Sequence, residues 1–371
     1  MAEKDTALMA HLMRRAGFGA QYDELERRAA KGYEATVEEL LNPTDETHGM
    51  DLDLAERYFI EWNHFIRCVP EYIAFRMVNS ANQLEEKMVL FWHGILCTAD
   101  SKTQSYVTSH AELEMLRRCG MGSFKDLLVE ISKDPAMVYF LDNCLSHKDA
   151  INENYGRELL ELFSMGVGMD GEFNYTEDDV KECARAFTGW TIANSIPQQP
   201  YGRYSSQFVY NPNDHDQGEK TFLGQTGNFN GEDIIDIICQ QPATARFLSR
   251  HLYNYFVADE AQVPAWMDTP LQDPDTIKML EDEYFRSDYN IQSMLRVLFN
   301  SDAFKNTRFS RIKGPIETVI GTLRLVGDWT SPKPGFESIF EEMKHRGQEI
   351  LNPPSVEGWH TGKEWIDGGT L

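Results

Sequence analysis

The sequence contains no long hydrophobic run. No stretch of the 371 residues approaches the ~18 uncharged apolar residues that a membrane-spanning helix requires, so we expect no membrane span. A secretory signal is missing as well, since Glu3, Lys4 and Asp5 stand at the start and His11 interrupts the apolar run behind them. The sequence therefore predicts a protein that stays in the cytoplasm, unless the chain is a processed or trimmed form.

Positive charge is also scarce. The chain has 35 Lys and Arg residues against 59 Asp and Glu, which gives a formal net charge of -24. No basic run is longer than Arg14-Arg15 or Arg117-Arg118. Such a surface repels phosphate backbones, which argues against a nucleic acid as partner and disfavours an anionic membrane surface. The charge indicates solubility, and it leaves a small molecule, a glycan or a protein as the open choices of partner.

Several signatures of known sites are absent. The 6 cysteines include no Cys-x-x-Cys pair and no zinc-finger spacing, so no disulfide framework is indicated. The chain has no Gly-x-Ser-x-Gly, no phosphate-binding loop and no His-Glu-x-x-His. Gly17-Phe18-Gly19 lacks both a preceding strand and a third glycine, and a nucleotide site is therefore not supported.

Apolar residues recur at helical spacing along most of the chain. Residues 82–97, with Leu84, Met88 and Phe91, are one example. With 42% hydrophobic and 12% aromatic residues, the pattern predicts a mainly α, single large multi-helix globular domain spanning 1–371. The expected helices are 6–17, 22–41, 52–80, 82–97, 110–119, 123–133, 135–144, 152–165, 176–187, 231–240, 242–257, 275–286, 291–299, 315–326 and 336–346.

Residues 191–229 differ from this pattern. They are rich in Gly, Pro, Asn, Gln and Tyr and show no helical period, which predicts an irregular, partly β insertion. We expect short strands at 207–210 and 220–223, joined through a turn at 211–214.

The helix at 152–165 carries the first cluster of polar residues. At ~100° per residue, Asn154, Glu158 and Glu161 fall on one face beside the apolar stripe. Paired carboxylates in such a place bind a metal or raise each other's pKa for acid–base chemistry. The alternative is a solvated helix face on which Arg157 pairs with Glu161.

Two further polar features lie elsewhere in the chain. The loop Asn213–Gly218 places His215 beside Asp216, close to Lys220, which offers metal ligands or a general base with its orienting carboxylate. The alternative is a structural turn that His215 caps. His93 follows Phe91-Trp92 on an apolar helix, where a lone histidine is usually a core residue, and His251 is interpreted in the same way.

Ordered segments along the chain resemble the bacterial family named domain of unknown function 1800 (DUF1800). The segments cover almost the whole chain: 11–19 (HLMRRAGFG), 90–94 (LFWHG), 134–137 (DPAM), 152–163 (NENYGRELLELF), 184–190 (ARAFTGW), 215–224 (HDQGEKTFLG), 241–247 (QPATARF), 312–317 (IKGPIE) and 353–359 (PPSVEGW).

This resemblance implies that the polar clusters are not accidental, because the family pattern keeps them. One departure counts against a metal: relatives commonly carry a second histidine two residues after the one matching His93, where this chain has Ile95. Relatives often have an export signal and extend past the last tryptophan motif, and the family name itself records no activity.

Three functions remain open from the sequence. The leading hypothesis is a metal-assisted hydrolase with a divalent metal held by His93, Glu158 and His215. Its catalytic residues would be Glu158, His215, Asp216, Arg157 and Lys220, with Asp216 orienting His215 and Arg157 or Lys220 meeting an anionic group. The second is a glycan-active enzyme with a carboxylate pair and an aromatic platform of Trp190, Tyr201, Tyr204 and Tyr210. The third is a non-catalytic helical binding or assembly module whose polar clusters form buried hydrogen-bond networks.

Overall fold

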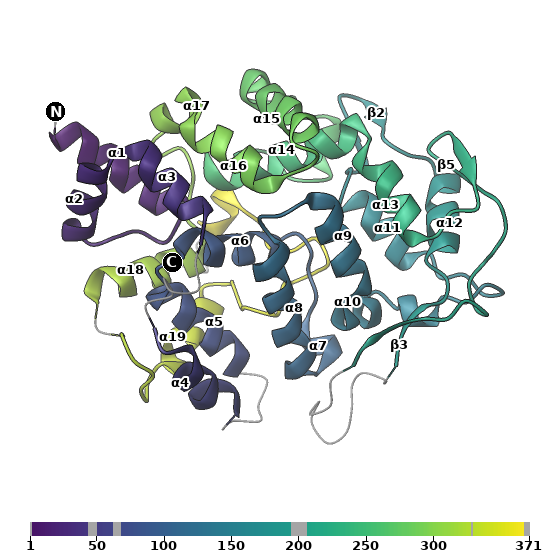
Figure 1. The fold of residues 1–371 in the computed structure, drawn as a ribbon, viewed down its shortest axis with the longest axis horizontal. Helices are drawn as coiled ribbons and strands as arrows, with labels where there is room; N and C mark the ends of the chain where they lie inside the picture. The colour runs from purple at the N-terminus through teal and green to yellow at the C-terminus, as the bar shows by residue number, and fades with distance from the viewer. Residues whose placement is uncertain (1, 44–49, 62–67, 194–205, 328, 367–371) are drawn as a thin grey trace.

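The computed structural model describes residues 2–43, 50–61, 68–193, 206–327 and 329–366, and it is mainly helical (Figure 1). In these ranges it has nineteen α-helices and three two-stranded antiparallel sheets. The predicted fold class, a mainly α domain with a small β insertion, is confirmed. No described helix is long and apolar enough to cross a membrane.

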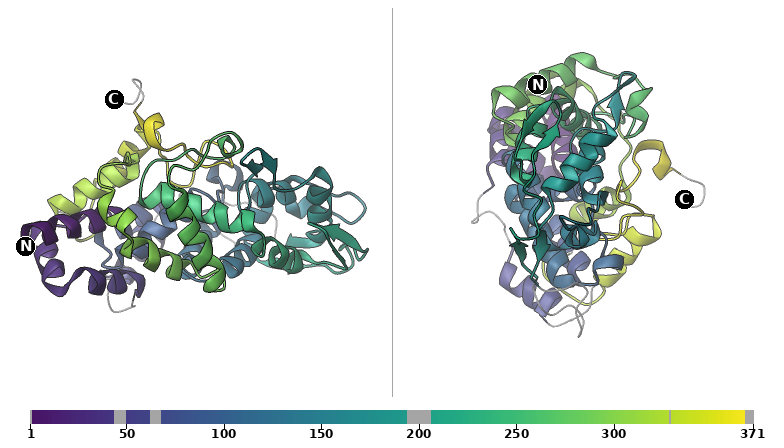
Figure 2. Two further views of the ribbon diagram at one scale, coloured as in Figure 1. Left: turned by 90° about the horizontal axis from the view of Figure 1, so that it is seen from above. Right: turned by 90° about the vertical axis from the view of Figure 1, so that its right-hand side faces the viewer.

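The helices form an elongated body, with the first three helices at one end and α12 with the β segments at the other (Figures 1 and 2). The longer helices are α1 (Ala2–Arg15), α2 (Tyr22–Lys31), α3 (Tyr33–Leu41), α5 (Cys68–Asn79), α6 (Gln83–His93), α8 (Tyr106–Cys119), α9 (Phe124–Lys133), α11 (Asn154–Glu161), α12 (Glu177–Ala186), α13 (Gly231–Cys239), α14 (Pro242–Phe256), α15 (Pro274–Arg286), α16 (Ile291–Asn300), α18 (Pro315–Val326) and α19 (Glu337–His345). Short helices are α4 (Leu52–Glu56), α7 (Asp100–Thr103), α10 (Pro135–Phe140) and α17 (Asp302–Asn306).

Helix boundaries differ from the prediction where glycine or local turns intervene. The expected helix 22–41 is two helices, because Gly32 adopts φ +107°, a backbone angle that ends α2 and that other residues rarely adopt. The expected helix 152–165 ends earlier, at Glu161. The short helices α7 and α17 were not predicted, since four or five residues show no periodicity.

The predicted strand pairing was wrong. Strand β4 (Phe208–Tyr210) pairs with β3 (Trp190–Ile192), and β5 (Lys220–Phe222) pairs with β6 (Gln225–Gly227). The third sheet joins β1 (Gly168–Met169) and β2 (Glu172–Phe173). The turn at 211–214 therefore connects two separate sheets. Two short strands around a turn do not, by their local sequence pattern, specify the strand with which each one pairs.

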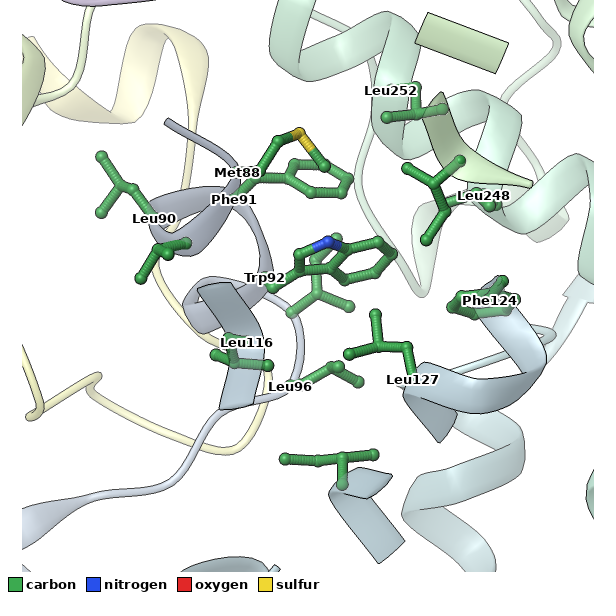
Figure 3. Packing of buried hydrophobic residues seen from close by; sticks show 14 of the residues in the cluster. Met88, Leu90, Phe91, Trp92, Leu96, Leu116, Phe124, Leu127, Leu248 and Leu252 are labelled. Atoms are coloured by element: carbon green, nitrogen blue, oxygen red, sulfur yellow. The ribbon is translucent and has the colours of Figure 1, made fainter. Parts of the chain in front are cut away.

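The core is centred on α6, and Trp92 lies at its middle (Figure 3). The Trp92 side chain is 0% exposed, its Nε1–H donates to the carbonyl of Gly120 at 2.7 Å, and its ring stacks on Phe124 with centroids 5.7 Å apart. Leucines of α9 and α14 surround it, among them Leu127 and Leu248 (Figure 3). Burial of such a large ring with its N–H satisfied stabilises the junction of these helices by several kcal/mol, at ~25 cal/mol per Å².

Two charged residues of α6, Glu86 and Lys87, are buried together with its apolar residues. Glu86 accepts from Arg76 Nε at 2.8 Å and from Arg117 Nη2 at 2.9 Å, so two arginines from α5 and α8 surround one carboxylate. Burial favours a higher pKa for Glu86, but the charges of Arg117 and Arg76 outweigh it and hold the pKa below its usual value. The side chain is ionised and fixes the mutual placement of three helices.

Glu86→Gln should destabilise the protein strongly. The substitution leaves the buried Arg76 and Arg117 with Glu114 alone, which contacts Arg117 Nη1 at 2.5 Å, and the free energy of unfolding should fall by about 3–5 kcal/mol. Urea unfolding followed by circular dichroism measures this change. Glu130→Gln is the matched control, because Glu130 forms an exposed pair with Arg118 at 3.0 Å and its loss should cost at most about 1 kcal/mol. Similar losses in both variants would contradict the role of Glu86.

Candidate functional site

Glu158 lies in α11, which packs closely on α12. Gly156 allows this approach, since a Cβ there would lie 3.0 Å from the backbone nitrogen of Ala184. The Glu158 side chain is half-buried, and its carboxyl group forms no hydrogen bond or ion pair with any described residue. Burial raises the pKa of Glu158 to about 7, the charges of Glu161 and Glu357 add to the shift, and Arg157 opposes it. An unpaired carboxyl group of this kind is able both to donate and to accept a proton near neutral pH.

Arg157 is committed to other carboxylates. Its Nη1 and Nη2 donate to the two oxygens of Glu177 at 2.9 and 2.8 Å, and Nη2 also lies 3.4 Å from Glu153. The pair with Glu161 that the alternative interpretation required is replaced by these contacts. Arg157 therefore ties α11 to the start of α12.

The loop with His215 and Asp216 packs against the end of α12. His215 is buried, and its Nδ1 lies 2.9 Å from the carbonyl oxygen of Thr188. Asp216 accepts from Arg185 Nε at 2.9 Å and Nη2 at 3.2 Å, so this carboxylate is paired with arginine instead of orienting His215. Lys220 donates through Nζ to the carbonyl of Asp216 at 2.6 Å. Burial lowers the pKa of both His215 and Lys220.

His93 is a core residue. Its Nε2 accepts from the backbone N–H of Leu351 at 3.0 Å, and its ring meets Trp359 edge-on at 5.3 Å. Burial lowers the pKa of His93 to about 4, so the ring is neutral. It anchors the C-terminal segment, which runs back across the end of α6.

The predicted metal site is not formed. Among the described residues, no three His, Cys, Asp or Glu side chains come together as a set able to hold a metal ion. His93 bonds the C-terminal segment, His215 bonds the backbone after α12, and Glu158 lies near Glu161 and Glu357. Each of the three side chains thus has different neighbours, and the three do not form a shared metal site.

Two residues of the aromatic platform proposed for a glycan, Trp190 and Tyr210, lie in the described part of the chain. Trp190 is buried, stacks edge-on with Phe187 and donates through Nε1 to Asn230, so its ring is not available to a sugar. Tyr210 is partly exposed. Tyr201 and Tyr204 lie outside the described residues.

The structure reveals a cleft that the sequence did not predict. It has a volume of about 840 Å³ including its open side and lies between the ends of α6 and α14, the start of α18 and the C-terminal segment. Aromatic rings line much of it, which is typical of sites for small molecules. The lining includes Leu90, Phe91, Ile95, Leu162, His251, Asn254, Tyr255, Gln262, Val263, Arg311, Glu317, Gln348, Glu357, Trp359 and Trp365.

The floor of the cleft carries a buried group of charges, which we call the cation cluster: Arg15, Lys87 and Arg311 around Glu317. Arg311 Nη1 lies 2.5 Å and Arg15 Nη1 3.8 Å from the Glu317 carboxylate, and Lys87 Nζ also donates to it. Arg311 further lies over the Tyr255 ring, 4.8 Å from its centroid. Burial lowers the pKa of Lys87 to about 7 and that of Arg15 to about 10.

The cluster holds three basic side chains, and a second carboxylate lies nearby. Asp259 is that carboxylate, engaged by the backbone N–H of Ile312 at 3.0 Å. Because burial lowers the pKa of Lys87 to about 7, the side chains that stay fully cationic at neutral pH are Arg15 and Arg311. Arg311 is 4% exposed and lines the cleft, yet its Nη2 has no hydrogen-bond partner in the described part of the chain. The cleft thus offers a positively charged, partly unsatisfied donor next to aromatic walls.

Sequence reasoning missed the cleft because its residues are far apart in the chain. The available signal was that segments 11–19, 90–94, 152–163, 312–317 and 353–359, through which the chain resembles a known family, each contribute to the cleft or to its cation cluster. Their meeting in one place follows only from the fold.

Asp216→Ala should loosen the loop against α12. The variant removes three acceptor contacts, two from Arg185 and one from the N–H of Gly218 at 2.8 Å, so the free energy of unfolding should fall by about 1–3 kcal/mol. Urea unfolding measures the change, and limited proteolysis should show faster cleavage near 211–220. Asp214→Ala, which removes an exposed contact to His147, is the control. Unchanged stability with loss of a ligand-dependent activity would favour the catalytic interpretation of this loop.

The comparisons with known proteins bear on the whole chain. A family described as a protein of unknown function (DUF1800) matches residues 11–371. No curated protein and no solved structure shows significant similarity to the chain. The family match includes every segment that builds the cleft. The chain therefore belongs to the DUF1800 family.

Proposed function

We propose that this protein binds a small organic anion in the cleft, with Arg311 as the residue that receives the anionic group. The observation that carries the proposal is the cation cluster beneath an aromatic-lined cleft in a chain of net charge -24. Glu317 compensates the charge of Arg311 and raises its pKa, so Arg311 stays cationic. Its Nη2, which has no hydrogen-bond partner among the described residues, is able to donate to a carboxylate or phosphate group in the cleft.

The geometry limits the kind of ligand. Phe91, Tyr255, Trp359 and Trp365 supply apolar and aromatic walls, while Asn254 and Gln348 add polar groups. A ligand with an apolar or aromatic body and one anionic end matches this arrangement. Glu357 at the exposed rim disfavours a second anionic group there.

Arg311→Gln should weaken binding of such ligands at least about tenfold, because one charge-assisted hydrogen bond contributes about 1.5–3 kcal/mol. The measurement is affinity selection with mass spectrometry on the full chain, using a defined mixture of small aromatic and aliphatic carboxylates and phosphates. Arg118→Gln is the control, since it removes a surface arginine outside the cleft.

Thermal melting of both variants confirms that they are folded before binding is compared. Equal retention of the acids by the wild type and Arg311→Gln, or retention of neutral and cationic compounds only, would contradict the proposal.

Hydrolysis of the bound ligand is the second candidate function, and Glu158 favours it. Its carboxyl group is unpaired among the described residues, interacts with Glu357 of the cleft rim, and precedes by one turn Leu162, which lines the cleft. Under this proposal Glu158 acts as general acid or base toward water. Arg157, His215, Asp216 and Lys220 would act by positioning α11 and the loop, because their charged groups are engaged with other protein groups.

Glu158→Gln should then lower any hydrolytic rate by about 10²-fold or more. A screen of nitrophenyl esters, phosphates and glycosides provides the assay, and the wild-type rate should change with an inflection near pH 7, where the pKa of Glu158 lies. Glu130→Gln, at an exposed position outside the cleft, is the control. A rate that survives in Glu158→Gln, or a pH profile that the substitution leaves unaltered, would exclude this residue as the acid or base.

A further inference from the structure

A second recess lies on the face formed by α1 and α18, next to the cation cluster, since the Phe18 ring that lines it lies 4.7 Å from Lys87 Nζ. It has a volume of about 560 Å³ including its open side, and we call it the α1–α18 groove. Small side chains such as Ala10 and Ala20 line it, together with the half-buried Arg14 and the exposed Lys313 and Leu325. A chain segment, extended or helical, is one kind of ligand that binds in a groove beside a helix.

Three cations without ion pairs lie in or beside this groove: Arg14 and Lys313 line it, and Arg308 lies near Arg14. Most arginine and lysine side chains of the described residues contact an Asp or Glu, but Arg14, Arg308 and Lys313 do not. The charge that acts on Arg14 is that of Arg308, another cation, and this repulsion adds to burial in lowering the pKa of Arg14. For Lys313 the only nearby carboxylate is Glu317, which Lys87 and Arg311 already engage.

Exposed apolar side chains border the same cations. Phe309 is 90% exposed, and Arg14 lies over its ring at 5.7 Å from the centroid. Its backbone has φ +61°, a left-handed angle that is rare for a bulky residue and that stores strain unless the surroundings require it. Leu325, which lines the groove, is 61% exposed. The protein thus presents an aromatic and an aliphatic side chain to solvent next to unpaired cations.

We propose that the α1–α18 groove binds an acidic, amphipathic segment of a partner protein. Carboxylates of the segment would meet Arg14, Arg308 and Lys313, and its apolar residues would pack on Phe309 and Leu325. Charge complementarity selects this partner, because a local excess of cations is unusual on a chain of net charge -24. At physiological salt the screening length is about 8 Å, so these three cations outweigh more distant acids for a ligand that enters the groove.

A narrow segment also explains the geometry better than a membrane or a nucleic acid. A bilayer surface is broad and would bring anionic lipids beyond the groove against a chain of net charge -24. A nucleic acid would extend a continuous line of phosphates past the groove over the same acidic chain. A peptide segment confines its charge to the groove and supplies apolar side chains for Phe309 and Leu325.

The test uses the full chain and a fluorescein-labelled synthetic peptide in which Glu and Leu alternate, followed by fluorescence anisotropy. We expect binding by the wild type and a rise of the dissociation constant by at least about tenfold in the double variant Arg308→Glu/Lys313→Glu. The double variant Arg118→Glu/Lys181→Glu makes the same change in net charge at exposed positions elsewhere and should bind as the wild type does. Phe309→Ser should weaken binding without altering charge.

The other outcomes overturn the proposal. These are no binding at millimolar peptide, equal binding by both charge-reversed variants, or equal binding of a control peptide with Gln in place of every Glu. Preference for phosphatidylserine vesicles or a single-stranded oligonucleotide over the peptide would replace the protein partner with that ligand. Melting curves establish that all variants are folded, and the result is independent of Arg311 and the cleft.

Discussion

The charge of Lys87 on the buried helix α6 constrains much of this structure. The side chain is 0% exposed, and a lone ammonium group in such a place would lose its proton or unfold the site. Glu317 at the start of α18 supplies the counter-charge, and Arg15 from α1 and Arg311 before α18 then gather around the same carboxylate. Three segments from the two ends of the chain are thereby fixed to the central helix.

The same arrangement creates the feature that suggests a function. Glu317 compensates Arg311, but the Nη2 of Arg311 has no hydrogen-bond partner among the described residues, and the cleft gives solvent-borne molecules access to it. The group formed by Glu86, Arg76 and Arg117 provides a contrast, one residue earlier on α6. Glu114 also pairs with Arg117 in this group, and the group lines no described cleft, so its role is to hold α5, α6 and α8 together.

Local pattern predicted the helices well, since Leu84, Met88, Phe91 and Trp92 follow a helical period and are all buried. It left His93 open between a core residue and a metal ligand, and the fold buries this ring against Leu351 and Trp359. The prediction of strand pairing failed because β4 pairs with β3 and β5 pairs with β6, and the short sequences of these strands do not specify their partners. Polar motifs were informative about position but not about role: Asp216 stands beside His215 in sequence, yet the fold pairs it with Arg185, a residue of α12.

The sequence by itself determined the mainly helical class, the family, the irregular insertion and the acidic surface, because periodicity, motif order and composition are local or additive properties of the chain. Only the tertiary structure decided which polar residues meet. Arg14 and Arg15 are adjacent in sequence, but on a helix they point to different sides, so one lines the α1–α18 groove and the other joins the cation cluster. Lys87 and Glu317 are 230 residues apart and touch, since burial makes an unpaired charge too costly to leave alone.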